Sequence, residues 1–259
     1  MKAKLGQNFL ADPSVLAFEA KAAGVKGKSV LEIGAGDGRL TEKLLSEGAG
    51  HITAIEIDPK LAKQLRMKFS ARLNSRVRVL EQDFLSFSQD RKYNVIMGNI
   101  PYYITSPILF KISKMDFDIA ILCIQKEVAE RMLAPAGTSG YGRLSVSTQL
   151  VFETELLASV GREAFSPRPR VDSCIISLRK TGFSLSEQEE KAIGSLFSHK
   201  KKSLKNAVVD ARQGLFGSSD KKSALAIAQT LKYSERKVFT LTPKEALEAA
   251  KQLGVANGN

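Results

Sequence analysis

The residues best suited to chemistry are Asn99-Ile100-Pro101-Tyr102, which follow an apolar segment at residues 94–98. The Asn99 amide and a backbone carbonyl of the proline-stiffened turn offer two oxygen acceptors beside a flat aromatic ring. Such acceptors could bind both hydrogens of an exocyclic amino group and favour a pyramidal nitrogen, its lone pair aimed at a nearby electrophile. No strong general base is then required. The alternative interpretation is an ordinary Asn-x-Pro turn after a strand.

A glycine-rich segment, Gly34-Ala35-Gly36-Asp37-Gly38, follows the apolar run at 30–33 and precedes residues at helical spacing. This pattern predicts a buried strand, a glycine turn and a helix, with the backbone open to a ligand. The Gly-x-Gly-x-Gly spacing differs from the Gly-x-Gly-x-x-Gly of pyrophosphate-binding folds, which favours a nucleoside ligand without a diphosphate. A tight strand-to-helix turn that binds nothing is the alternative.

Acidic residues end the next two predicted strands. Glu56 closes the segment 51–56, where a carboxylate could accept hydrogen bonds from both hydroxyls of a ribose. Asp83 follows a strand at 77–80 and could accept from an adenine amino group, although a turn cap is the alternative. Because ligands of open parallel sheets bind at the carboxyl edge, these polar strand ends together favour a nucleoside site.

Elements further along the chain complete a predicted α/β domain over residues 1–181. Asp12-Pro13 and Asp58-Pro59 are typical of helix starts. Further strands are expected at 117–124, 153–160 and 174–178, further helices at 104–112 and 126–133, and a mobile loop at 141–146 after the flexible segment 138–140.

The segment Phe165 to Ser173 contains prolines at 167 and 169 and is predicted to be a rigid extended loop. Arg168 and Arg170 add positive charge suited to phosphates. Phe165 is either a core anchor or a stacking surface.

Residues 182–259 are predicted to form a smaller helical domain, because strand-like patterning ends near Lys180. A helix is expected to begin at Ser186, and another at His199. Lys200, Lys201 and Lys202 then form a cationic face, which is either solvated or in contact with phosphates.

Composition narrows the classes of function. The 259 residues carry a formal net charge of +12, which indicates a polyanionic partner, although surplus lysine alone is the alternative. Long apolar runs and a signal-peptide core are missing from the sequence, so we expect a cytoplasmic protein without a membrane segment. Cys123 and Cys174 lie in apolar runs, and His51 and His199 are the only histidines, so we expect neither a disulfide nor a metal site.

These motifs, in this order and at these intervals, resemble the KsgA-type ribosomal RNA adenine dimethyltransferases. Gly6-Gln7-Asn8-Phe9-Leu10 is similar to the amino-terminal signature of that family, and Phe165 to Ser173 to its Phe-x-Pro-x-Pro-x-Val-Asp-Ser element. The resemblance implies a Rossmann-like class I S-adenosylmethionine methyltransferase sheet of seven strands, the last antiparallel, with a small C-terminal all-helical domain.

The resemblance also implies roles for individual residues. S-adenosylmethionine would be the methyl donor, with Glu56 holding its ribose and Asp83 its adenine. The target adenine would lie between Tyr102 and Phe165, its amino group held by Asn99 and the Pro101 carbonyl. The cofactor-binding residues it implies are Asn8, Leu10, Gly34, Gly36, Glu56, Asp83 and Asn99.

The implied substrate is a pair of adjacent adenosines near the end of small-subunit ribosomal RNA, each methylated twice. The partner would be an immature small subunit, bound by a monomer through the domain 182–259. This chain reads Phe197-Ser198-His199-Lys200-Lys201-Lys202 where the family commonly has Phe-x-x-Arg-Arg-Lys, which keeps the charge but loses bidentate phosphate contacts. The alternatives are an Erm-type enzyme acting on large-subunit RNA and a non-catalytic RNA-binding assembly factor.

Overall fold

The computed structural model describes residues 8–70, 76–217 and 220–255 of the chain. Two compact units are present. The first unit is Met1–Ala129 with Glu153–Lys180, and the second is Glu130–Phe152 with Thr181–Asn259. The sequence places the domain change at residue 181, and the structure in addition assigns residues 130–152 to the second unit.

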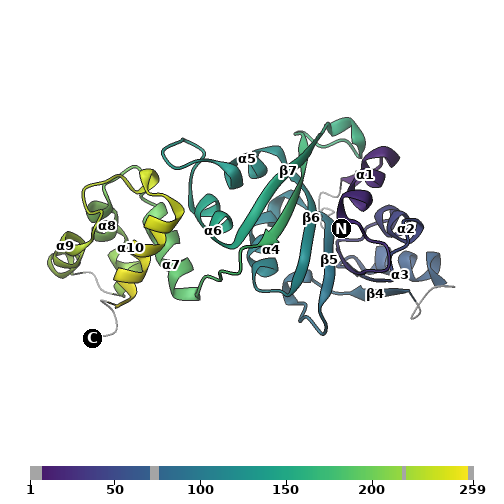
Figure 1. The fold of residues 1–259 in the computed structure, drawn as a ribbon, viewed down its shortest axis with the longest axis horizontal. Helices are drawn as coiled ribbons and strands as arrows, with labels where there is room; N and C mark the ends of the chain where they lie inside the picture. The colour runs from purple at the N-terminus through teal and green to yellow at the C-terminus, as the bar shows by residue number, and fades with distance from the viewer. Residues whose placement is uncertain (1–7, 71–75, 218–219, 256–259) are drawn as a thin grey trace. The chain divides into compact units, whose positions relative to one another are not determined.

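A seven-stranded sheet forms the first unit (Figure 1). Neighbouring strands follow the order β4-β3-β2-β5-β6-β9-β7. The pairs β4–β3, β3–β2, β2–β5 and β5–β6 are parallel, whereas β9 is antiparallel to β6. This topology confirms the predicted sheet with an antiparallel last strand. The strands are β2 (Ser29–Ile33), β3 (His51–Glu56), β4 (Val77–Glu81), β5 (Tyr93–Asn99), β6 (Phe117–Gln125), β7 (Phe152–Val160) and β9 (Ser173–Lys180).

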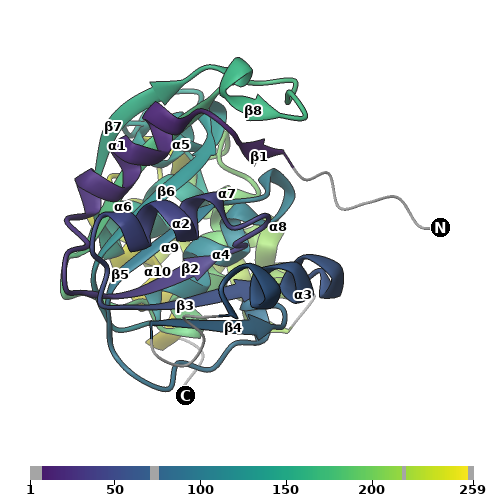
Figure 2. The same ribbon diagram turned by 90° about the vertical axis from the view of Figure 1, so that its right-hand side faces the viewer.

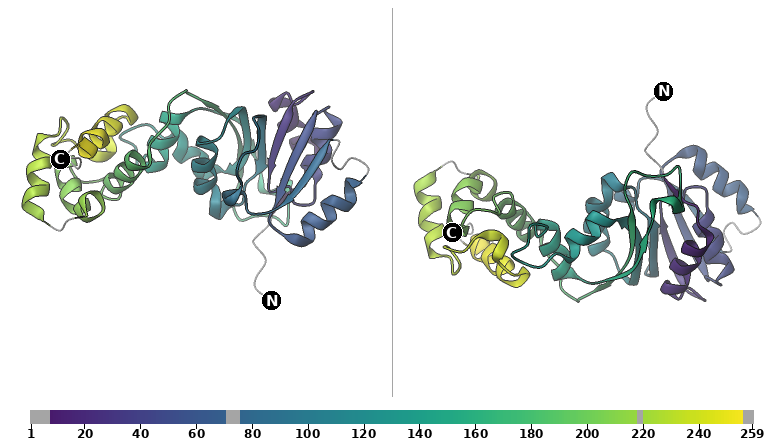
Figure 3. Two further views of the ribbon diagram at one scale, coloured as in Figure 1. Left: turned by 90° about the horizontal axis from the view of Figure 1, so that it is seen from below. Right: turned by 90° about the horizontal axis from the view of Figure 1, so that it is seen from above.

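Helices cover both faces of this sheet, as parallel strands require. Helices α1 (Pro13–Ala23), α2 (Arg39–Ser46) and α3 (Pro59–Lys68) lie on one face, and α4 (Thr105–Ser113) on the other (Figures 1 and 3). The carboxylates of Asp12 and Asp58 accept backbone N–H groups at the starts of α1 and α3, and so cap them as predicted. Helix α5 (Lys126–Leu133) follows β6.

A second, two-stranded sheet joins segments far apart in the sequence (Figure 2). Strand β1 (Phe9–Leu10) pairs antiparallel with β8 (Phe165–Ser166), and Leu10 lies opposite Phe165. The backbone N–H of Ala11 extends this pairing by donating to the Ala164 carbonyl over 2.7 Å. The sequence analysis treats both segments as irregular, so this sheet is a feature it missed.

The second unit is helical, as predicted. It contains α6 (Arg143–Val151), α7 (Glu187–Phe197), α8 (Leu204–Phe216), α9 (Lys221–Thr230) and α10 (Pro243–Val255). Ser186 and Glu189 form the expected capping box. The prediction that a helix begins at His199 is wrong: residues 199–202 form a turn, and α8 begins at Leu204 after Ser203.

The helices of the described part of the chain were compared with the length and apolar character of membrane-spanning helices. None of the helices described there combines the length and apolar character needed to cross a bilayer.

Gly98 precedes the candidate residue Asn99 at the closest approach of β5 to β2. A Cβ atom on Gly98 would lie 2.6 Å from the Ile33 carbonyl oxygen, which is backbone and cannot rotate away. We therefore expect Gly98→Ala to lower the free energy of unfolding by about 1–3 kcal/mol, the range for overpacked cores. Urea denaturation would measure it.

Gly254→Ala is the matched control, because a Cβ at that position in α10 meets no atom within 4 Å. This variant should lose no stability, since alanine favours a helix over glycine. If both variants unfold like the parent protein, a Cβ atom at Gly98 does not lower the free energy of unfolding, and the contact between β5 and β2 does not require glycine.

Candidate active site

One pocket in the first unit gathers most of the residues singled out in the sequence. It opens at the carboxyl ends of β2, β3 and β5 and is bordered by the turn after β4. The predicted residues that line it are Asn8, Leu10, Gly34, Gly36, Glu56, Asp83, Asn99, Pro101 and Phe165. Tyr102 begins the short helix η3 (Tyr102–Ile104), and its side chain lies outside the described part of the chain.

The order of strands fixes the order of these groups along the sheet edge. Asp83 follows β4, Glu56 ends β3, Gly34 follows β2, and Asn99 ends β5. Adjacent strands of a sheet are about 4.8 Å apart, so the four groups span an extended ligand rather than converge on one atom. The edge therefore suits a nucleoside with an extended substituent.

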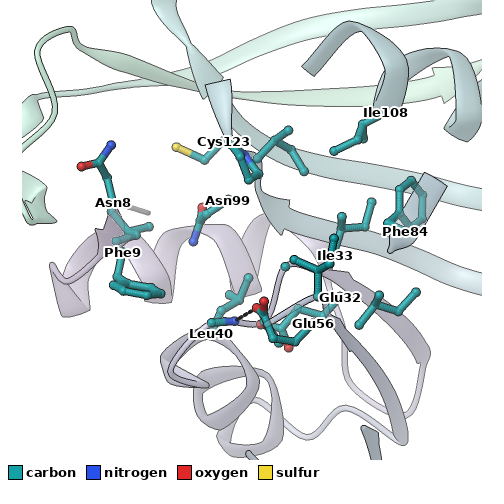
Figure 4. Close-up of a pocket in the computed structure, with 18 of the residues that line it drawn as sticks. Asn8, Phe9, Glu32, Ile33, Leu40, Glu56, Phe84, Asn99, Ile108 and Cys123 are labelled. Carbon is teal, nitrogen blue, oxygen red and sulfur yellow. Dashed lines mark hydrogen bonds between the residues drawn. The ribbon is translucent and has the colours of Figure 1, made fainter. Parts of the chain in front are cut away.

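Glu56 ties the glycine turn to β3. Its side chain is 3% exposed, and its Oε2 accepts the Gly36 N–H over 2.8 Å (Figure 4), while Oε1 accepts the Asp58 N–H over 2.9 Å. Each carboxylate oxygen has a second lone pair, so the group can still accept hydrogen bonds from ligand hydroxyls. Glu56 thus shapes the turn and keeps acceptor capacity towards the pocket.

Glycines are required in the turn for different physical reasons. Gly34 has φ of +68°, and a Cβ there would project into open space, so a backbone conformation that favours glycine faces the pocket. At Gly36 a Cβ would lie 2.8 Å from the Phe9 ring, and at Gly38 one would lie 2.7 Å from Leu65. The first glycine therefore leaves room for a ligand, and the other two allow close packing.

Asn99 presents an unsatisfied acceptor. Its Oδ1 is buried and has no hydrogen-bond partner in the protein. In Figure 4 its amide points into the open centre of the pocket. A buried acceptor without a partner costs about 1–3 kcal/mol, so a donor from a ligand is the natural occupant. The neighbouring Pro101 carbonyl accepts the Ile104 N–H over 3.1 Å and the Thr105 hydroxyl over 3.4 Å, so a ligand donor would replace the longer of these bonds.

Asp83 caps a turn, as the alternative interpretation of this residue held, and it also lines the pocket. Its Oδ1 caps η2 (Phe84–Ser86) by accepting the Leu85 N–H over 2.9 Å. Phe84 beside it is 5% exposed and lines the pocket. A carboxylate and an aromatic ring therefore lie together at the β4 end of the site.

The β1–β8 sheet closes the other end of the pocket. Phe165 is 7% exposed, lines the pocket and packs in the same core cluster as Leu10. Phe165 is therefore packed as a core anchor and also borders the cavity, and its stacking on a ligand stays a prediction. Asn8 precedes this sheet at the pocket wall.

Several lining residues were not predicted. Cys123 was interpreted only as a buried hydrophobe, yet it lies near the end of β6 and lines the pocket. Burial raises the pKa of its thiol well above the usual value. Tyr103 lines the pocket and is 60% exposed, and Glu32 lines it with only 1% exposure. These three residues lie near or just beyond the ends of predicted strands, and this position was the sequence signal that could have placed them in the pocket.

The predicted RNA-binding cations are not among the residues that line this pocket. Arg168 and Arg170 are exposed in the loop after β8, and Arg168 lies 3.9 Å from the Glu163 carboxylate. In the second unit, Lys202 is ion-paired with Asp210, and Lys201 is exposed.

Lys200 acts as a local anchor within the second unit. Its ammonium donates to the carbonyls of Ser139 and Tyr141 over 2.9 and 2.7 Å. The Tyr141 hydroxyl in turn donates to the Leu241 carbonyl over 2.8 Å, and its ring meets Phe197 edge-on. The segment predicted to be a mobile loop is therefore held by several contacts.

This anchoring predicts that Lys200→Ala lowers the free energy of unfolding by about 1.5–3 kcal/mol, the range for hydrogen bonds to charged groups. Lys201→Ala, one residue on and exposed, is the control and should leave it unchanged. Chemical denaturation of both variants measures the difference. Equal stability of the two would show that the Lys200 contacts contribute nothing.

Metal ligands are not assembled in the described residues, where no group of three histidine, cysteine, aspartate or glutamate side chains is placed to hold an ion.

Comparison with known proteins identifies the family. Residues 1–245 match the model of the family described as ribosomal RNA adenine dimethylase. The chain belongs to this family. A relative from Thermococcus gammatolerans, named probable ribosomal RNA small subunit methyltransferase A, is 37% identical over 246 residues, covering 94% of this chain and 86% of the relative.

Solved structures agree with the dimethylase assignment. A dimethyladenosine transferase from Plasmodium falciparum superposes with a TM-score of 0.77 at 30% identity, covering 93% of this chain and 95% of that one. The 23S rRNA methyltransferase ErmE also has 30% identity, with a TM-score of 0.64 and coverage of 95% and 100%. The dimethylase fold thus extends over both units of the chain.

The pocket of this dimethylase fits S-adenosylmethionine by the chemistry of its lining. Glu56 and Asp83 line it with carboxylates that can accept hydrogens from hydroxyl or amino groups, and Gly34 leaves the backbone open. The pocket is also acidic, since Asp37, Glu56 and Asp83 line it and Arg39 is ion-paired with Asp37. An acidic lining suits a ligand that carries net positive charge.

Proposed function

We propose that this protein dimethylates the exocyclic amino groups of two adjacent adenosines near the 3' end of small-subunit ribosomal RNA, using S-adenosylmethionine. The observation that carries the proposal is the buried Asn99 Oδ1, an acceptor without a hydrogen-bond partner on a residue that lines an acidic pocket. A ligand amino group can donate a hydrogen bond to such an acceptor. A ligand without this donor would leave the buried acceptor unpaired, so the site favours an amino group.

The chain offers a holding group for each part of the cofactor. Asp83 would accept from its adenine and Glu56 from its ribose, while the turn at Gly34 and Gly36 would face the amino-acid portion. Asn8 and Leu10 would border this portion from the β1–β8 sheet, and Asn99 would lie beside the methyl group. The bound cofactor supplies an electrophilic methyl group on a sulfonium.

Asn99 and the Pro101 carbonyl would accept the two hydrogens of the target amino group. This arrangement draws the nitrogen lone pair out of conjugation with the purine ring and holds it towards the methyl group. The new carbon–nitrogen bond forms as the carbon–sulfur bond breaks, and the nitrogen then releases a proton to solvent. Tyr102 and Phe165 would stack on the purine, which must leave its own stack to enter.

The RNA backbone would be bound by exposed cations, with Arg168 and Arg170 in the first unit and Lys200, Lys201 and Lys202 in the second. Among these, Lys201 has no competing role in the structure, whereas Lys200 anchors its own unit. Residues 182–259 would serve as the part that binds RNA or the ribosome. The partner would be an immature small subunit in the cytoplasm, the protein would act as a monomer, and methylation would contribute to subunit biogenesis.

The choice of subunit rests on the names of the relatives. The Thermococcus relative is named for the small subunit, while ErmE is named for 23S RNA and superposes less closely than the dimethyladenosine transferase. An Erm-type activity and a non-catalytic assembly factor are the competing functions.

Labelled methyl transfer to immature small subunits and, separately, to large subunits tests the proposal, with mass spectrometry of the digested RNA. Dimethyladenosine confined to the small subunit is the expected result. Labelling of the large subunit would favour the Erm-type function. Tight binding without labelling would favour the assembly factor.

A further inference from the structure

Two carboxyl groups beneath the pocket have no part in the function proposed above. Glu19 lies on α1, Glu32 lies on β2, and each is only 1% exposed. Helix α1 packs against α2 and β6, which encloses the pair between helices and sheet. Acidic side chains are almost never this buried without a partner, so their presence requires an explanation.

The pair is poorly satisfied by hydrogen bonds. Thr41 Oγ1 donates to Glu32 Oε2 over 2.6 Å, whereas Glu19 Oε2 is buried without a hydrogen-bond partner. Burial raises the pKa of Glu32 to about 8, an effect that the Thr41 hydrogen bond opposes. Burial, and to a smaller extent the charge of the neighbouring Glu32, raises the pKa of Glu19 to about 8.

Negatively charged groups near the pair also favour the protonated form of its carboxyl groups. The carboxylates of Glu56 and Asp37 raise the pKa of Glu32. The Cys123 thiol interacts with Glu19 from β6. Arg39, the basic residue among the described pocket lining, is engaged by Asp37 over 2.9 Å. The immediate electrostatic environment is therefore acidic.

The strand order places Glu32 under one half of the cofactor. If the adenine lies at β4 and the ribose at β3, the sulfonium and amino-acid half lies over β2, the next strand. Glu32 is on β2, two residues before Gly34, and lines the pocket there. This half of the cofactor bears the sulfonium and ammonium charges, and Glu19, which does not line the pocket, interacts electrostatically with Glu32.

We propose that Glu19 and Glu32 form a proton-linked counter-ion for the cofactor: each carboxyl group holds a proton in the free protein, and the positive charge of the bound cofactor displaces the proton of Glu32. This proposal rests on the proposed function, because it takes the ligand to be a sulfonium cation. The proton leaves a carboxyl group and passes to the buffer, and one carboxylate remains facing the cation. Cofactor affinity then rises with pH, by at most about tenfold per pH unit, until Glu32 of the free protein has lost its proton near pH 8.

Calorimetric titration of S-adenosylmethionine into the full chain at pH 7 tests the linkage. Repeating it in buffers of different ionisation enthalpy counts the protons exchanged. A group with a pKa of about 8 is about nine-tenths protonated at pH 7, so release should approach one proton. Glu32→Gln keeps the side-chain shape and an acceptor for Thr41 but has no proton to lose, so its release should fall towards zero.

Comparison of the two proteins removes the contribution of the cofactor's own amino group, which is the same in both. Equal proton release from parent and Glu32→Gln would overturn the linkage. Normal cofactor binding by the parent without any release would overturn it too, while leaving the proposed function intact. Failure of the parent to bind the cofactor at all would instead remove the proposed function and the linkage with it.

Glu19→Gln supplies a second test that needs no cofactor. A carboxyl whose pKa is raised on folding stabilises the folded state fully below its unfolded pKa, and this contribution is lost as pH rises towards 8. The thermal midpoint of the parent should therefore fall between pH 5.5 and 8.5 more steeply than that of Glu19→Gln. Parallel profiles would show that Glu19 holds no proton, and the pair would be rejected.

Discussion

Asn99→Ala is expected to reduce methyl transfer by about 10²–10³-fold while RNA affinity changes little. The magnitude is that found when one preorganised hydrogen-bonding group is removed from a catalytic site. Asn99 is placed for this role by the end of β5, and its Oδ1 is buried without a partner in the protein. Because alanine removes an unsatisfied acceptor rather than a used one, the variant should fold at least as stably as the parent. Single-turnover transfer, filter binding and thermal unfolding measure the three quantities.

Asn94→Ala is the matched control on the same strand. Asn94 lies near the start of β5, where its Oδ1 accepts the Ser29 N–H and its Nδ2 donates to Asp118. Its loss should cost about 1 kcal/mol of stability and leave methyl transfer unchanged. Unreduced transfer by Asn99→Ala would exclude the proposed role of that residue.

Sheet and pocket were predictable because both follow from short-range patterns. Apolar runs ending in Gly34, Glu56, Asp83 and Asn99 indicate parallel strands, and parallel strands place their carboxyl ends along one edge. The structure brings these four residues to one pocket.

The pairing of distant strands and the partners of long, flexible side chains could not be predicted from the sequence. Strands β1 and β8 have two residues each, too few for periodicity to show, and they pair across most of the first unit's sequence. Helix α6 was missed because its buried polar residues gave a loop-like pattern, yet the hydroxyls of Ser145 and Thr148 donate to backbone carbonyls. Lys200 is part of a basic run, and only tertiary structure shows that it binds carbonyls.

Glu56 connects the predictable and unpredictable parts of the site. Its position at the end of β3 is evident in the sequence, whereas its two bonds to the N–H groups of Gly36 and Asp58 are not. The same carboxylate therefore builds the turn that it would share with the cofactor ribose. A change at this position should affect the shape of the pocket as well as its charge.

Glu56→Gln is accordingly expected to weaken S-adenosylmethionine binding by about 10–100-fold. Glutamine keeps one acceptor oxygen, but its amide nitrogen would face a backbone N–H and cannot accept from it. One charge-assisted hydrogen bond worth about 1.5–3 kcal/mol is lost, together with an acceptor for the ribose. Glu81→Gln is the control, because Glu81 lies opposite Glu56 on β4 but is ion-paired with Arg66 at the surface. Equilibrium binding of labelled cofactor to both variants measures the effect. Equal affinities would mean that Glu56 neither shapes the turn nor meets the ligand.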